Sequence, residues 1–188
     1  MAERDVVRWY PMRVTYNREL KVKERLDALN IETYIPMHYQ IVVRGGNRRR
    51  LLVPAIHNLI FVHSSQANIT NLKMTDPTME PLRYIMHKSH EDKDAPATII
   101  RVPDAQMENF VKATKIEDDS LVYLNYEEYL SKPGKRVLII DGPFTGVEGV
   151  IKRIKKNRQV VVAIDDLAAV MITAVPRSYL KELEDSKP

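Results

Sequence analysis

Apolar and polar residues predict a strand and then a helix at the start of the chain. Residues 6–15 are rich in valine, tryptophan, tyrosine and methionine and predict a first strand, in which Pro11 favours an edge or a bulge. Residues 18–30 predict a helix with Asn17 as its N-cap. The apolar residues of that helix recur every three or four positions and define its buried side: Val22, Leu26 and Leu29.

The middle of the chain predicts short strands with two further helices between them. A long strand over 31–44 is followed by the hairpin turn Gly45–Gly46, with arginines 48–50 exposed on the returning arm. Further strands are expected over 51–53, 58–63, 82–86 and 98–102, and helices over 69–74 and 103–115. Because helices and antiparallel strands are mixed in this way, residues 1–115 predict an α+β sandwich.

After an acidic and then tyrosine-rich linker over 116–132, the pattern predicts strands almost alone. Residues 137–140 form an apolar run, and valine-rich and alanine-rich strands are expected over 158–164 and 168–174, before a helical turn over 176–183. Short strands at this spacing favour a small barrel over residues 133–188. The β-branched residues and internal glycines make a helical form of this segment unfavourable.

The start of this C-terminal segment resembles the KOW motif. It contains Gly-Pro-Phe-x-Gly-x-x-Gly, the form typical of transcription elongation factors of the NusG family. The residues that carry the resemblance are Gly134, Val137, Ile139, Gly142, Pro143, Phe144, Gly146, Gly149 and Val150. Glycines inside a strand pattern mark bulges or close backbone approaches, which the corners of a small barrel require.

Segments nearer the N-terminus occur in the order found in the NGN domain of NusG-like proteins. They are Trp9–Tyr10, a helix, Tyr34–Pro36, the basic tip 44–50 and residues 57–62. The resemblance covers nearly the whole chain and is closest to the specialised RfaH and UpxY-type antiterminators. It implies an NGN-like α/β sandwich with an antiparallel sheet, followed by an SH3-like β-barrel, the KOW domain. It also implies a bacterial transcription elongation or antitermination factor.

The resemblance further implies that an apolar surface of the NGN-like domain binds the clamp helices of the RNA polymerase β′ subunit. Ile56, Leu59 and Phe61 lie where the family carries an FPxYxF-type segment. Tyr34 and Pro36, on the neighbouring strand, would join them. The usual Phe-Pro-x-Tyr is here Ile-His-Asn-Leu, which keeps the apolar character and loses the aromatic ring. The alternative is that these residues belong to the ordinary core.

A basic stripe is expected on the first helix. Arg18, Lys21 and Arg25 share one side of it, directly after Tyr16 and Asn17. In RfaH-like paralogues this region reads a hairpin of the exposed non-template DNA strand. Cations hold the phosphates, and an aromatic or amide group handles a flipped base. The alternative is a solvated helix face.

The resemblance also gives the KOW domain a partner, either the ribosomal protein NusE or the termination factor Rho. The motif residues concerned are Gly142, Pro143, Phe144, Val147 and Gly149. Family members use an apolar residue near Val147, and the small valine favours a paralogue over NusG itself. Basic residues crowd the next hairpin and either contact nascent RNA or form a charged tip: Lys152, Arg153, Lys155, Lys156 and Arg158.

Composition and charge restrict the functional classes. The net charge is +4, but residues 1–60 carry 11 Lys and Arg against 6 Asp and Glu, whereas residues 76–128 carry 6 against 12. Basic segments favour phosphates or acidic partners. The absence of cysteine excludes disulfides and thiol catalysis and fits a cytoplasmic location. No apolar run predicts a membrane span or a secretory signal.

No arrangement of residues predicts catalysis, a cofactor or a metal. Neither a P-loop nor a nucleophile elbow occurs. Asp165–Asp166 predicts a turn between strands, and His87 with His90 supplies too few ligands for a metal site. We therefore expect a monomeric protein that is not an enzyme and acts by binding. The alternative is a KOW-containing protein that binds RNA or ribosomes and does not act on polymerase.

Overall fold

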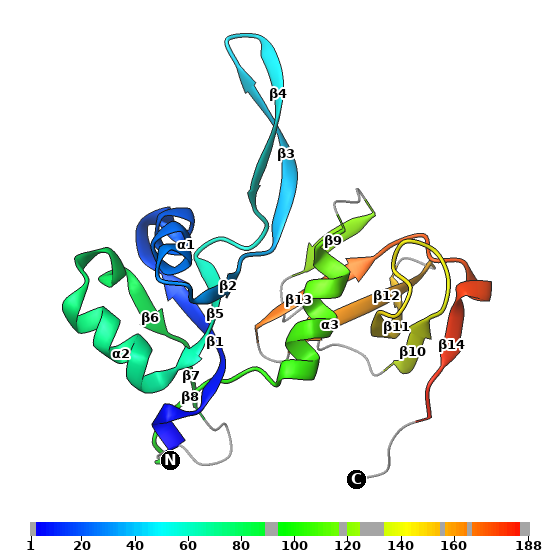
Figure 1. The fold of residues 1–188 in the computed structure, drawn as a ribbon. Coiled ribbons are helices and arrows are strands. Elements are labelled where there is room, and N and C mark those ends of the chain that lie inside the picture. Colours follow the sequence, from blue (N-terminus) through cyan, green and yellow to red (C-terminus); the bar gives the residue numbers. More distant parts are fainter. Residues whose placement is uncertain are drawn as a thin grey trace. The chain divides into compact units, whose positions relative to one another are not determined.

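The computed structural model describes most of the chain as two compact units (Figure 1). The described residues are 3–88, 94–116, 120–124, 134–154, 157–164 and 167–184. Unit 1 comprises Met1–Ile35 and Ile56–Asp104, and unit 2 comprises Pro36–Ala55 and Ala105–Pro188. The predicted domain boundaries at residues 115 and 133 stay a prediction.

Unit 1 is built on a four-stranded antiparallel sheet in the order β2-β5-β1-β6. Its strands are β1 (Val7–Val14), β2 (Glu32–Tyr34), β5 (Leu59–Ser65) and β6 (Leu82–Tyr84). Its helices are α1 (Glu19–Ala28) and α2 (Gln66–Thr75), and a small second sheet pairs β7 (Met86–His87) with β8 (Thr98–Ile99). Three short 3-10 turns complete it: Glu3–Asp5, Thr15–Asn17 and Pro77–Met79.

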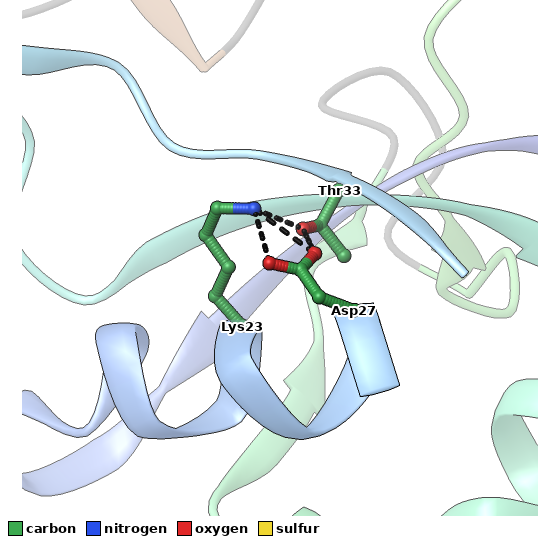
Figure 2. Close-up of polar contacts among 3 residues, drawn as sticks. All are labelled: Lys23, Asp27 and Thr33. Carbon is green, nitrogen blue, oxygen red and sulfur yellow. Dashed lines mark hydrogen bonds and ion pairs between the residues drawn. The ribbon is translucent and has the colours of Figure 1, made fainter. Parts of the chain in front are cut away.

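Helix α1 is fixed to one face of this sheet by a polar cluster that Figure 2 shows. The ammonium group of Lys23 donates hydrogen bonds to the Asp27 carboxylate at 2.8 Å and to the Thr33 hydroxyl on β2 at 3.1 Å. Thr33 in turn donates to Asp27 at 3.1 Å. Since Val22 and Leu26 are also buried, α1 packs its apolar side on the face to which Thr33 points.

Helix α2 covers the same face farther along the sheet. The Asn68 side chain donates to the Ser64 hydroxyl at 3.0 Å, and Thr70 lies within hydrogen-bonding distance of the Tyr84 hydroxyl at 3.3 Å. Successive strand residues alternate between faces, and residues paired across antiparallel strands share a face. Thr33, Ser64 and Tyr84 therefore mark a helix-covered face, and the residues that alternate with them mark the opposite face, here called the far face.

Two local predictions in unit 1 are wrong. Asn17 does not cap α1, because the cap position is Arg18 and no side chain makes the cap hydrogen bond there. The strand predicted over 31–44 is two strands, since the chain leaves the sheet at Ile35–Pro36. Proline has no backbone donor for a sheet ladder, which explains the break.

Unit 2 contains a six-stranded antiparallel sheet in the order β14-β10-β11-β12-β13-β9. The strands are β9 (Leu121–Leu124), β10 (Lys135–Ile139), β11 (Glu148–Ile154), β12 (Asn157–Ile164), β13 (Ala168–Ile172) and β14 (Leu180–Glu182). The unit also contains helix α3 (Asp104–Thr114, from Ala105 onward) and the separate hairpin of β3 (Met37–Arg44) and β4 (Asn47–Pro54). Residues 121–124 thus form a strand inside the predicted linker.

The structure confirms a mixed α/β chain with antiparallel sheets, and it confirms strands in the described part of residues 133–188. An SH3-like barrel is not confirmed, because β14 and β9 stand at opposite ends of the sheet order and no closing pair is seen among the described residues. The terminal segment predicted as a helical turn is a 3-10 turn, Arg177–Tyr179, followed by β14.

Gly149 on β11 is required for close packing of the neighbouring strand. A Cβ atom there would lie 2.6 Å from Cγ1 of Val160 and 2.8 Å from the carbonyl oxygen of Val161, both on β12. Strands β11 and β12 therefore approach each other at a distance that only glycine permits.

Candidate functional site

Three of the predicted polymerase-binding residues lie together on the far face of the unit 1 sheet. Tyr34 on β2 pairs directly with Phe61 on β5, and Phe61 pairs with Pro11 on β1. Leu59 lies two residues before Phe61 and points to the same side. Helices α1 and α2 lie against the other face, so they do not account for the burial of Leu59 and Phe61 in this apolar row.

Sequence reasoning missed two members of this row, Trp9 and Pro11. Trp9 pairs with His63, and their rings stack with centroids 4.6 Å apart. His63 Nδ1 lies 2.9 Å from a carboxylate oxygen of Glu32 on β2. The alternation of side chains along residues 9–11 could have indicated that Trp9 and Pro11 share a face. Only the register of β1 against β5 shows which face that is. The far face thus has an apolar centre with a polar row beside it.

The predicted polymerase-binding residues differ in burial. Leu59 is 5% exposed and Phe61 is 0% exposed, whereas Tyr34 and Ile56 are half-buried. Pro36 belongs to unit 2, where its carbonyl accepts a hydrogen bond from Ala55 N at the base of the hairpin. Substitutions at Leu59 or Phe61 therefore report on folding first, and Ile56 is the better position for a surface test.

The first two of the predicted nucleic-acid-binding residues have an unusual backbone conformation. Tyr16 and Asn17 both adopt positive φ, 65° and 52°. This conformation is uncommon for residues other than glycine, and for a bulky aromatic residue it is an outlier. The Tyr16 side chain is 77% exposed, so no core packing accounts for the strain. Strained backbone of this kind concentrates at functional sites.

The basic stripe of α1 consists of three exposed cations with different surroundings. The Arg18 guanidinium lies 5.5 Å from the centre of the Tyr16 ring, and Arg25 Nε donates to a carboxylate oxygen of Asp76 at 2.7 Å. No partner is found for Lys21 among the described residues. The hydrogen bond from Arg25 holds the pKa of Asp76 below its ordinary value.

A hollow of about 180 Å³ lies beside the stripe, between α1 and the turn that follows Asp76. Its lining is Arg18, Lys21, Val22, Pro77 and Thr78. Two cations at the rim and an exposed aromatic ring next to them provide both the charge and the stacking surface that single-stranded nucleic acid uses.

The KOW turn is closed by its own hydrogen bonds. Gly142, at φ 84°, accepts from Thr145 N at 3.1 Å, and Gly146 N donates to the Ile139 carbonyl at 2.7 Å. Phe144 is 5% exposed and Val147 is 0% exposed. A partner on this surface therefore meets Pro143 and Thr145, which are exposed, whereas Val147 is inaccessible unless the turn rearranges.

Helix α3 is held against the same turn, which sequence reasoning did not predict. The Asn109 side chain donates to the Glu148 carbonyl at 2.7 Å and accepts from Glu148 N at 2.8 Å. Lys112 donates to the Gly146 carbonyl at 3.3 Å. A hollow of about 560 Å³ beside these contacts is lined by α3, β11 and β12.

Several predicted basic residues lie partly or wholly outside the described part of the structure. Lys155 and Lys156 are not described, and neither are the side chains of Arg153 and Arg158. Lys152 is half-buried, and desolvation lowers the pKa of its ammonium group.

His90 and Asp165–Asp166 also lie outside the described residues. Within the described ranges, no group of three or more His, Asp or Glu side chains could hold a metal. Among the residues that the structure describes, no helix combines the length and apolar character that a membrane crossing requires.

Comparison with known families gives two matches. Residues 7–111 match the family described as "Transcription termination factor nusG", and residues 133–164 match the KOW motif. The first match contains the whole sheet of unit 1 and the basic stripe, and the second contains the turn that α3 contacts. Among the curated proteins nothing matches the chain.

Proposed function

The chain belongs to the NusG family of transcription factors, and from this premise we propose that it is a specialised antitermination or elongation factor similar to RfaH and UpxY. The family match over residues 7–111 is the observation that carries the proposal. The change from Phe-Pro-x-Tyr to Ile-His-Asn-Leu before β5 and the valine at position 147 favour a paralogue over a general factor.

The polymerase contact that we propose is made by the far face and its rim. Tyr34 pairs with Phe61 in the apolar row, which also contains Pro11, and Ile56 is half-buried in the bend before β5. An apolar surface with a polar edge suits a helical partner, and we assign the clamp helices of the β′ subunit to it. This contact would bridge the clamp across the main channel, so that paused states open less easily.

The basic stripe would hold the non-template DNA strand in the transcribing complex. Arg18 and Lys21 border the small hollow and are the phosphate-binding candidates, while Tyr16 would stack on an unpaired base. Arg25 would join them only after releasing Asp76.

The C-terminal sheet would close as an SH3-like KOW barrel and recruit a further partner, for which NusE and Rho are the family candidates. Pro143 and Thr145 are the exposed residues of the turn that such a partner would meet. We propose that the protein has no active site, acts by binding energy alone and works in the cytoplasm.

A pause assay on a reconstituted elongation complex tests this function. The protein should shorten the lifetime of a strong pause, and a variant with Arg18 and Lys21 replaced by alanine should lose most of that effect. An unchanged pause lifetime with the wild-type protein, together with binding to ribosomal RNA, would favour the alternative of a KOW-containing RNA- or ribosome-binding protein.

A further inference from the structure

The hairpin of β3 and β4 is a long two-stranded ribbon (Figure 1). Its side chains are mostly exposed. Its strands pair from Met37 with Pro54 to Arg44 with Asn47, and each strand has eight residues. At about 3.3 Å per residue the ribbon is roughly 26 Å long. We call it the arginine ribbon.

The arginine ribbon carries charge of one sign. It contains Arg44, Arg48, Arg49 and Arg50, and the sequence has no Asp or Glu between Glu32 and Asp76. Among the described residues, no carboxylate pairs with Arg44, Arg48 or Arg49. A ribbon that carries four arginines and no Asp or Glu of its own fits a polyanionic partner.

The arginines lie on both faces of the ribbon. Val43 pairs with Arg48 and Val42 pairs with Arg49, so that these two consecutive arginines point to opposite sides. Arg44 is two residues from Val42 and shares the face of Arg49. A flat acidic surface could satisfy the cations of one face only. A groove with a phosphate wall on each side satisfies both.

The apolar residues of the ribbon are also unusually exposed. Ile41 and Val43 are 67% and 62% exposed, and both lie on the face of Arg48. The Arg50 guanidinium lies 4.0 Å from the centre of the Tyr39 ring on that face. This stacking holds one cation and one aromatic ring in a fixed arrangement. Apolar side chains between cations suit the methyl groups and sugars that line a groove.

We propose that the arginine ribbon is a binding site for double-stranded DNA, which it enters through the major groove. The major groove of B-form DNA is about 12 Å wide and admits a two-stranded β-ribbon, whereas the major groove of A-form RNA is too narrow and deep for side chains to read. This site consists of other residues than the basic stripe on α1. The proposal does not depend on whether the chain binds polymerase.

Fluorescence anisotropy of the full chain with a labelled 20-base-pair DNA duplex tests this site. The variant replaces Arg44, Arg48 and Arg49 by alanine and leaves the Arg50 stack intact. Removing three phosphate contacts should lower the slope of log affinity against log salt by about 2.7, at 0.9 per contact, and weaken binding at least about tenfold at low salt. Replacement of the same arginines by lysine should retain most of the slope.

A matched control removes the same charge elsewhere, with Arg4, Lys115 and Arg177 replaced by alanine; all three are exposed. This control should bind the duplex nearly as wild type does, and both variants should keep the wild-type unfolding temperature. The proposal is overturned if the ribbon variant binds the duplex like the control. It is also overturned if the variant loses as much affinity for a 20-nucleotide single strand or for polyglutamate as it loses for the duplex, because the ribbon would then bind any polyanion.

Discussion

Arg25 on α1 donates a hydrogen bond of 2.7 Å from its Nε to the carboxylate of Asp76, 51 residues away in the sequence. The other carboxylate oxygen of Asp76 accepts from Thr78 N at 2.9 Å and caps the turn Pro77–Met79. One of the three stripe cations is therefore already paired inside unit 1. In the isolated protein the stripe therefore has fewer cations available for a ligand than its sequence indicates.

Removing the charge of Asp76 should strengthen the binding of single-stranded DNA. Asp76→Asn keeps an oxygen that can cap Thr78 N and frees Arg25, so we expect the salt slope on single-stranded DNA to rise by up to about 0.7, the value for one added phosphate contact. Salt titration by fluorescence anisotropy measures it. Asp76→Asn combined with Arg25→Ala should return the slope to the wild-type value; weaker binding by Asp76→Asn alone would contradict the assignment.

The same pair predicts a pH dependence of stability. The pKa of Asp76 is lowered in the folded protein, chiefly by the hydrogen bond from Arg25, so its contribution is fully present above the unfolded-state pKa and is lost as the pH falls through the folded-state value. The difference in unfolding temperature between wild type and Asp76→Asn should be constant from about pH 8 to pH 5 and shrink below pH 4. A difference that grows on acidification would have the wrong sign.

Gly149→Val should destabilise unit 2. The added Cβ would overlap Val160 and the Val161 carbonyl on β12, and overpacking of this kind costs about 1–3 kcal/mol. Glu148→Val is the matched control, because residue 148 is exposed on the same strand. Urea unfolding followed by circular dichroism should show a lower midpoint for the Gly149 variant alone. Equal midpoints for the two variants would mean that β12 can move away without cost.

Asn109→Ala should loosen the contact between α3 and the KOW turn. The variant loses both hydrogen bonds to the main chain of Glu148, which together are worth about 1–3 kcal/mol. Glu108→Ala, at the adjacent exposed position of α3, is the control. Hydrogen exchange at the amide of Glu148 should become faster in the Asn109 variant and stay unchanged in the control. No change in either would show that other contacts hold the turn.

Most of the helices and strands could be predicted from the sequence because their patterns are local. The spacing of Val22, Leu26 and Leu29 indicated α1, and the valine-rich run indicated β12. Pro36 was visible in the sequence inside the predicted long strand, but its β-branched neighbours favoured an uninterrupted strand. Asn17 was a reasonable cap by type, yet it follows Tyr16 in a left-handed backbone, which leaves the cap position to Arg18.

The candidate sites could be predicted only in part, because their geometry depends on residues far apart in the sequence. Resemblance indicated Leu59 and Phe61, but the register that places Pro11 and Tyr34 beside them is a property of the folded sheet. The salt bridge that occupies Arg25 has no local signature. The arginines of the ribbon were visible in the sequence, whereas their distribution over two faces followed from the strand pairing.

Ile56→Asp should disrupt the polymerase contact. Ile56 is half-buried in the bend before β5, and a carboxylate placed in an apolar interface without a partner should weaken binding at least about thirtyfold. His57→Asp introduces the same carboxylate at the exposed neighbouring position and should bind nearly as wild type. Affinity is measured on purified core polymerase with folded variants, and equal affinity for both variants would place the interface elsewhere.

Binding of the full chain to purified core RNA polymerase tests the central claim most directly. The protein is mixed with polymerase or with ribosomes at equal concentration, and each mixture is separated by size-exclusion chromatography. The account predicts a one-to-one complex with polymerase, which persists with the ribbon variant and is lost with Ile56→Asp. Comigration with ribosomes and none with polymerase would contradict it.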